Sequence, residues 1–262
     1  MRVLITGAGR AIGRATAEAL TERGHDVVAT ARRPEVLDGL DVAQTLALDV
    51  TEDDSVATCV AAAGDLDAIV NNAALNVRGP LDEYPTETFN QVLDTNVTGV
   101  LRMVQAVLPV WRPRGSGVFV NISSVNGKVA SPLSGSYAAS KYALEAMSEA
   151  MHYELGHFGI RTVIVEPGFI APGMKAETEH LGPSDYDGLR AQWDGMDDEL
   201  VGDAGRTPPE VAAGIIADCV ENADTPLRVP IGPDAETTLA FRKQLTDEEF
   251  EAAMRAQLGL TW

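Results

Sequence analysis

The chain has 262 residues, a length that accommodates one large domain or two small ones. Its apolar fraction of 45% is ample for a full hydrophobic core and excludes a disordered composition. The formal net charge of −19 argues against nucleic acid and anionic membrane surfaces as partners.

The protein is expected to be located in the cytoplasm. The chain opens directly on a predicted strand, and no apolar run approaches the ~18 residues needed to span a bilayer. Cys59 and Cys219 lie in apolar helical patterns, which is typical of buried thiols in a reducing compartment. Neither the cysteines nor the four histidines have ligand spacing, and the acidic cluster within 194–199 is interpreted as solvated surface, so no metal site is expected.

Short β-branched runs alternate with amphipathic helical patterns up to Pro167. The expected strands are 2–6, 26–31, 45–48, 68–71, 118–122 and 162–165. The expected helices are 12–23, 53–62, 86–110 and 136–157. The strand runs are almost continuously hydrophobic, as in strands buried on both faces. This alternation predicts an α/β fold with a doubly wound parallel sheet.

The pattern weakens after Pro172, and different elements are expected there. The segment 173–205 combines Gly and acidic residues with scattered apolar side chains, which predicts a substrate lid, with a surface helical insertion as the alternative. A helix at 209–221, a strand at 227–229 and a helix at 246–258 follow. The last helix begins with a capping box of Thr246 and Glu249. The segment 206–262 is expected to supply substrate-side and tail elements of the same single domain, 1–262.

A glycine-rich turn, Thr-Gly-Ala-Gly-Arg-Ala-Ile-Gly at 6–13, follows the first predicted strand and opens the first helix. Its glycines permit a tight turn and close approach of the backbone to a pyrophosphate. The helix N-terminus adds free N–H groups and the positive end of the helix dipole. A P-loop is excluded because no Gly-Lys-Ser/Thr ends the turn. The context predicts a dinucleotide site.

The end of the second predicted strand indicates which dinucleotide is bound. Ala31 occupies the position where an NAD-preferring site would carry Asp or Glu for the ribose hydroxyls, and Arg32 follows it. An arginine there accommodates the 2′-phosphate of NADP. Arg10, inside the glycine-rich turn, is a second candidate contact. These residues predict NADP(H) as the cofactor, with solvated surface charge as the alternative.

Tyr137 and Lys141 are four residues apart on a predicted helix, so they share one face. A free phenol titrates near ~10, and a nearby cation lowers that pKa. An ammonium about 4 Å away, at an effective dielectric of about 20, supplies roughly 4 kcal/mol, enough for about 3 pH units. The pair predicts an acid/base device, with an unremarkable surface pair as the alternative.

Other polar motifs end the remaining strands, at the edge where open α/β sheets bind ligands. Asp49 and Val50 end the third strand and would flank the adenine. The run 71–73 (Asn-Asn-Ala) ends the fourth strand. Ser124 follows the fifth strand and lies thirteen residues before Tyr137.

In order and spacing, these motifs resemble the short-chain dehydrogenase/reductase family over nearly the whole chain. The matching segments are 6–13, 71–73, 95–99, Ser124, Tyr137, Lys141 and 167–168. The segments 124–141 and 228–232 resemble its 17β-hydroxysteroid dehydrogenase-like branch. The resemblance implies a Rossmann-like fold and a homodimer or homotetramer formed through the helices that hold Asn96 and Tyr137.

The resemblance also implies a catalytic tetrad. Tyr137 is the general acid/base, and Lys141 lowers its pKa and holds the nicotinamide ribose. Ser124 hydrogen-bonds the substrate oxygen, and Asn96 holds a water that relays protons to Lys141. The implied cofactor contacts are Gly7, Gly9, Arg10, Ile12, Gly13, Arg32, Asp49, Val50, Asn72, Ala73, Tyr137, Lys141, Pro167, Gly168 and Ile170.

Two departures from the family pattern concern the cofactor. Ala11 stands where the family usually has Gly, which places a methyl group near the pyrophosphate. The run 167–172 (Pro-Gly-Phe-Ile-Ala-Pro) lacks the Thr that would touch the carboxamide.

We therefore expect an NADP(H)-dependent oxidoreductase that interconverts a hydrophobic ketone or aldehyde and its alcohol by hydride transfer. The expected substrate pocket is mostly apolar, with Leu75, Val125, Val129, Phe169, Ile170, Met174 and Trp193 in its wall. Two alternatives stay open, an epimerase or lyase-like enzyme on the same scaffold and a non-catalytic NADP(H)-sensing protein. The intact tetrad argues against the sensor.

Overall fold

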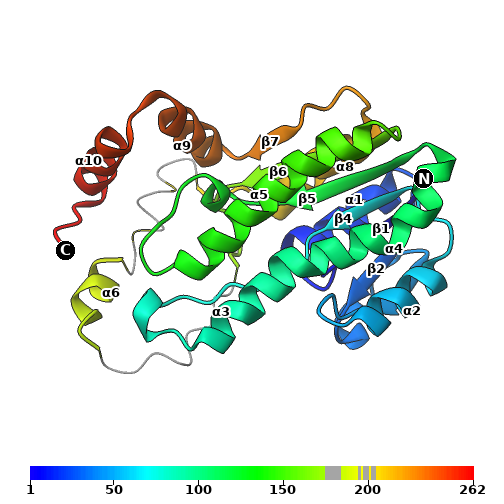
Figure 1. Ribbon diagram of the computed structural model, residues 1–262, viewed down its shortest axis with the longest axis horizontal. Helices are drawn as coiled ribbons and strands as arrows, with labels where there is room; N and C mark the ends of the chain where they lie inside the picture. The colour runs from blue at the N-terminus through cyan, green and yellow to red at the C-terminus, as the bar shows by residue number, and fades with distance from the viewer. Residues whose placement is uncertain (175–183, 194–195, 197–200, 202–204) are drawn as a thin grey trace.

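The computed structural model describes residues 1–174, 184–193, 196, 201 and 205–262. In this part of the chain a seven-stranded, all-parallel sheet has the order β3-β2-β1-β4-β5-β6-β7 (Figure 1). The order reverses between β1 and β4, which places a ligand crevice at the carboxyl ends of the strands there. The strands are β1 Arg2–Ile5, β2 Asp26–Ala31, β3 Gln44–Ala47, β4 Ala68–Asn71, β5 Gly117–Ile122, β6 Ile160–Pro167 and β7 Arg228–Ile231.

Helices cover both faces of the sheet, as the doubly wound arrangement requires. The described helices are α1 Ala11–Glu22, α2 Asp53–Ala63, α3 Thr86–Leu93, α4 Gly99–Arg114, α5 Gly135–Gly156, α6 Asp187–Trp193, α8 Pro209–Glu221, α9 Pro233–Gln244 and α10 Asp247–Leu258. Leu20 of α1 and Ile216 of α8 belong to the core on one face. Val56 of α2, Met103 of α4 and Leu144 of α5 belong to the core on the other. The predicted fold class is confirmed.

The single helix expected at 86–110 is in fact three segments. A π-helical turn, Asp94–Thr98, separates α3 from α4, and α4 continues through Pro109 and Pro113. It stops where Gly115 adopts a left-handed conformation with φ 72°, a common end for a helix. π-turns inside helices often occur at functional sites, and this one carries Asn96.

Helix α9 was missed from the sequence. Only Ala235 and Leu239 are buried along it, so the apolar periodicity is weak. The available signals are local: Pro233 at the first position, acidic residues in the first turn and Arg242 and Lys243 in the last. The capping box of Thr246 and Glu249 before α10 is present.

The C-terminal helices and α6 lie at the end of the molecule away from the N-terminus (Figure 1). Trp193 and Met196 pack against Leu258 in a small apolar cluster. Gln192 and Thr261 exchange two hydrogen bonds, of 3.1 and 3.0 Å.

Parts of the expected lid, 173–205, lie outside the described residues, as do His180 and the acidic side chains of the 194–199 cluster. No described helix is long and apolar enough to cross a membrane. Within the same residues, no group of side chains has the arrangement of a metal site.

Candidate active site

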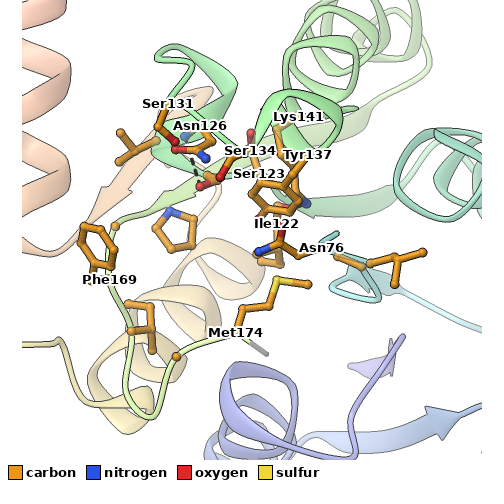
Figure 2. A pocket seen from close by; sticks show the side chains of 18 of the residues that line it. Asn76, Ile122, Ser123, Asn126, Ser131, Ser134, Tyr137, Lys141, Phe169 and Met174 are labelled. Atoms are coloured by element: carbon orange, nitrogen blue, oxygen red, sulfur yellow. Dashed lines mark hydrogen bonds between the residues drawn. The ribbon is translucent and has the colours of Figure 1, made fainter. Parts of the chain in front are cut away.

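One cavity of about 1410 Å³ lies at the carboxyl edge of the sheet, reaching from the glycine-rich turn to α10. Fifteen of the sequence-predicted site residues meet there, namely Gly7, Gly9, Arg10, Ile12, Arg32, Asp49, Val50, Asn72, Ala73, Ser124, Tyr137, Lys141, Pro167, Gly168 and Ile170. The other two predicted site residues, Gly13 and Asn96, do not line the cavity. All seven residues expected in the apolar substrate wall line it. Figure 2 shows Tyr137 and Lys141 on one side, with Phe169 across the pocket from them.

The Tyr137 phenol and the Ser124 hydroxyl meet at the floor of the substrate side. Tyr137 projects from α5, whereas Ser124 follows β5, and its Oγ accepts a hydrogen bond of 3.1 Å from the Asn126 N–H. Burial raises the pKa of Tyr137 to about 12, and the hydrogen bond with Ser124 offsets part of that rise. The phenol is therefore protonated at neutral pH.

Lys141 lies one helical turn after Tyr137 and is only 3% exposed. Its Nζ donates a 2.7 Å hydrogen bond to the Ile122 carbonyl and lies 5.5 Å from the centre of the Tyr137 ring. Burial lowers the pKa of Lys141 to about 8, and Glu145 one turn further on partly counteracts this.

The expected lowering of the Tyr137 pKa by Lys141 is not found in this structure. Such a lowering requires an ammonium about 4 Å from the phenol oxygen in a medium of effective dielectric about 20. In the structure Lys141 is held on the Ile122 carbonyl, and burial penalises the charged forms of both groups. Desolvation therefore dominates both pKa values.

Asn96 is 1% exposed, and its side chain holds the loop after β4. Its Oδ1 accepts from the Leu75 N–H at 2.7 Å, and its Nδ2 donates to the Leu75 carbonyl at 2.9 Å. Nδ2 also lies 2.9 Å from Ser140 Oγ, which donates to the Tyr137 carbonyl at 2.7 Å. The side chain thus joins the loop to the helix of Tyr137.

The glycine-rich turn is shaped for close backbone approach. Gly7 has φ +67°, and a Cβ on Gly13 would lie 2.4 Å from the Gly7 carbonyl oxygen. Ala11 also has a positive φ, 45°, at the position where the sequence departs from the expected Gly. A left-handed conformation costs a residue with a Cβ roughly 1 kcal/mol, so the departure stores strain in this turn.

Polar groups from two strand ends secure the turn. Thr6 Oγ1 accepts hydrogen bonds of 2.9 Å from the N–H groups of Asn72 and Ala73. Asn72 Nδ2 donates to the carbonyls of Thr6 and Gly7, each at 3.0 Å. The amide of Asn72 thereby ties β4 to the start of the turn.

The far end of the cavity carries three exposed arginines. Arg10, Arg32 and Arg33 line it, and none of them has an ion pair or hydrogen bond with the described residues. Most other described arginines are paired, for example Arg102 with Asp53 and Asp94. Acidic residues outnumber basic ones by 39 to 20 in the chain, so three unpaired arginines at one place are a distinctive feature.

Asp234 was not recognised from the sequence. Its carboxylate accepts a 2.7 Å hydrogen bond from the Phe169 N–H, and a Cβ on Gly168 would lie 2.0 Å from its Oδ2. The start of α9 therefore positions the segment after β6 that forms the cavity wall. Asn76, Phe250, Met254 and Leu260 also line the cavity without having been predicted.

These features fit a nicotinamide dinucleotide. The N-terminus of α1 has no side-chain cap, so its first N–H groups can receive a pyrophosphate. Gly7, Gly9 and Gly13 let the turn pack closely against Ala73, Val36 and the Gly7 carbonyl, where a Cβ would collide. The cavity continues from the turn past Asn72 to Lys141. Cofactor and substrate can therefore lie in one continuous space.

Comparisons with known proteins agree with this geometry. A 3-ketodihydrosphingosine reductase from Bacteroides thetaiotaomicron is 32% identical over 265 residues, covering 97% of this chain and 96% of the relative. The crystal structure of a short-chain dehydrogenase from Streptomyces avermitilis is 32% identical, covers 100% of this chain and 98% of its own, and has a TM-score of 0.82. A short chain dehydrogenase from Burkholderia cenocepacia, solved in complex with NADP, is 26% identical with a TM-score of 0.74, covering 98% of this chain and 96% of its own. The model of the short chain dehydrogenase family matches residues 1–181, and the chain belongs to this family of oxidoreductases.

Proposed function

We propose that the protein is an NADP(H)-dependent reductase of a hydrophobic ketone or aldehyde. The observation that carries the proposal is the meeting of the Tyr137 phenol and the Ser124 hydroxyl at the base of an apolar-walled cavity. Two hydroxyl groups at one point can hold one carbonyl oxygen. The buried ammonium of Lys141 lies beside them.

The proton chemistry follows from the two pKa values. A substrate carbonyl oxygen would accept hydrogen bonds from Ser124 and Tyr137, which stabilise the negative charge that develops on it. The cofactor supplies the hydride to the carbonyl carbon. Tyr137 then gives its proton to the oxygen, which is consistent with a phenol whose pKa of about 12 keeps it protonated. Lys141, when protonated, stabilises the phenolate that remains.

The unpaired arginines support NADP(H) over NAD(H). Arg10, Arg32 and Arg33 surround the end of β2, where Ala31 offers no carboxylate to a ribose hydroxyl. A charge-assisted hydrogen bond from arginine to a phosphate contributes roughly 1.5–3 kcal/mol. The complex of the Burkholderia cenocepacia relative with NADP is in line with this choice.

The apolar wall supports a hydrophobic substrate. Phe169, Met174 and Trp193 line the substrate side, and Met254 and Leu258 extend it along α10. One relative is named 3-ketodihydrosphingosine reductase, that is, for a keto substrate, and this name is in line with the proposal. We further propose that 173–205 closes over this side as a lid.

An oligomer formed through α4 and α5 is part of the proposal. Large apolar side chains are exposed on both helices, with Val110 at 53% and Tyr153 at 78%. Large exposed apolar side chains are what a surface covered by another subunit would present.

The experiment that tests the function is a carbonyl-reduction assay with NADPH and NADH, followed by the absorbance of the reduced nicotinamide. Hydrophobic ketones and aldehydes should oxidise NADPH faster than NADH. Conversion of a chiral alcohol without net cofactor change would instead indicate the epimerase. Saturable NADPH binding with neither reaction, over a broad panel, would indicate the sensor and refute the reductase.

A further inference from the structure

Asn76 is one of several polar residues that line the cavity near Tyr137, together with serines such as Ser123 and Ser134. It follows Leu75 in the loop after β4, lines the cavity and is 8% exposed. Figure 2 shows its side chain pointing into the pocket, next to the Tyr137 ring and above Met174. A group on a substrate whose carbonyl oxygen is held by Tyr137 would therefore pass close to this amide.

The backbone on both sides of Asn76 is fixed. Asn96 holds both the N–H and the carbonyl of Leu75, at 2.7 and 2.9 Å. The Val77 carbonyl accepts hydrogen bonds from the Tyr84 hydroxyl and, at 3.3 Å, from Ser136 Oγ. The backbone position of Asn76 is therefore set before any ligand arrives.

The side-chain amide of Asn76 is not satisfied by the described residues. Its Oδ1 is buried and has no hydrogen-bond partner among them. A buried polar atom left without a partner costs about 1–3 kcal/mol, and native proteins keep few of them. The amide of Asn76 is therefore unsatisfied on a loop that lines the cavity. A ligand would meet its nitrogen, or its oxygen after a rotation of the side chain.

We propose that Asn76 hydrogen-bonds a second oxygen function of the substrate, close to the carbon that receives the hydride. This inference rests on the proposed reductase activity and narrows its substrate class to hydrophobic hydroxyketones and diketones. A hydroxyl suits the site best, because it can donate to the amide oxygen or accept from the amide nitrogen.

The direct test measures binding, with turnover suppressed by Tyr137→Phe. Calorimetry with the Tyr137→Phe protein saturated with NADPH compares propiophenone with 2-hydroxypropiophenone, which differ by one hydroxyl. The hydroxyketone should bind about tenfold tighter, the worth of one good hydrogen bond. Adding Asn76→Leu should abolish that preference and leave propiophenone binding within about threefold. A preference that persists in Asn76→Leu, or that is absent beforehand, overturns the proposal.

Two further variants exclude less specific explanations. Met174→Leu reshapes the same part of the wall without removing a polar group, so both ligands should change alike and the preference should persist. Asn76→Asp keeps the size but only accepts hydrogen bonds, so it should retain the preference for 2-hydroxypropiophenone and lose any preference for 1-phenyl-1,2-propanedione. Loss of preference in Met174→Leu as well would assign the effect to shape and refute the role of Asn76.

Kinetics separate this inference from the proposed function. In otherwise unaltered protein, the ratio of kcat/KM for hydroxyketone over ketone should fall about tenfold on Asn76→Leu, and intrinsic reactivity cancels in that comparison. A protein that reduces neither compound but retains the Asn76-dependent binding preference would refute the reductase and leave the subsite standing. If the protein reduces both compounds but Asn76→Leu does not alter the ratio of their kcat/KM values, the reductase activity stands and the role of Asn76 is refuted.

Discussion

The two ends of the cavity are organised in opposite ways. At the substrate end, Asn96, Ser124 and Lys141 are buried or part-buried, and each is tied to another part of the chain. At the other end, Arg10 and Arg32 are exposed and have no partner among the described residues. The side chains of the first end are held in place by the fold itself, whereas the arginines of the second have no partner in the described part of the chain. Substitutions at the first should therefore change rates, and those at the second should change which cofactor binds.

The largest expected effect is that of Tyr137→Phe. The ring remains but the transferable proton is lost, so kcat should fall by about 10²–10⁴, the usual contribution of general acid catalysis. NADPH affinity, measured by fluorescence, should stay within about threefold, since only one hydroxyl leaves the site. Activity within tenfold of the parent would show that another group delivers the proton.

The double change Ala31→Asp with Arg32→Ala addresses the arginine end. It combines lost attraction for a 2′-phosphate with added repulsion, so the ratio of kcat/KM for NADPH over NADH should fall about tenfold to a hundredfold. Arg32→Ala alone should have a smaller effect because Arg10 and Arg33 remain. Arg14→Ala, which removes an arginine paired with Glu18, is the matched control and should leave the ratio unchanged. An unchanged ratio in the double variant would mean that the arginines are surface charge only.

The pH dependence of reduction distinguishes Lys141 from Tyr137. Below pH about 8 the Lys141 ammonium is charged, and above it the charge is lost, whereas Tyr137, with a pKa of about 12, keeps its proton throughout. kcat/KM for the carbonyl should therefore decline as pH rises through about 8. Lys141→Arg should have lower activity but no decline in this range, because arginine stays protonated. If kcat/KM of the Lys141→Arg variant still declines near pH 8, the decline belongs to another group.

The smallest expected effect is that of Ala11→Gly. Glycine adopts a φ of +45° without the clash of a Cβ, but it also has more freedom to lose on folding. The net gain in unfolding free energy should be at most about 1 kcal/mol, measured by urea denaturation. NADPH binding should be equal or tighter. A loss of stability greater than about 1 kcal/mol, the largest cost of the added freedom of glycine, would show that Ala11 is not strained in this turn.

The residues that could be predicted share one property, that a local pattern marks them. Tyr137 and Lys141 are spaced by one helical turn, and Gly7 and Ser124 follow strands whose apolar runs are unmistakable. The residues that were missed depend on contacts between distant segments. Asp234 accepts a hydrogen bond from the N–H of Phe169, which lies 65 residues earlier in the chain, and no pattern within α9 predicts that bond.

The error in the Tyr137 pKa has the same origin. The sequence places an ammonium near the phenol, but it does not show that Ile122 accepts a hydrogen bond from Lys141 or how completely the fold removes water from both groups. Burial is a property of the whole tertiary structure. The acid/base pair could therefore be predicted from the sequence, but the pKa values of its two members could not.

The last residues of the chain also have a practical consequence for handling the protein. Leu260 lines the cavity, Thr261 is bonded to Gln192 of α6, and the Trp262 ring lies 6.1 Å from that of Tyr186. The C-terminus is thus part of the substrate end, so an affinity tag or fusion partner attached there would lie against the cavity mouth. A tag at the N-terminus leaves that mouth unaltered, because Met1 precedes β1 at the opposite end of the molecule (Figure 1).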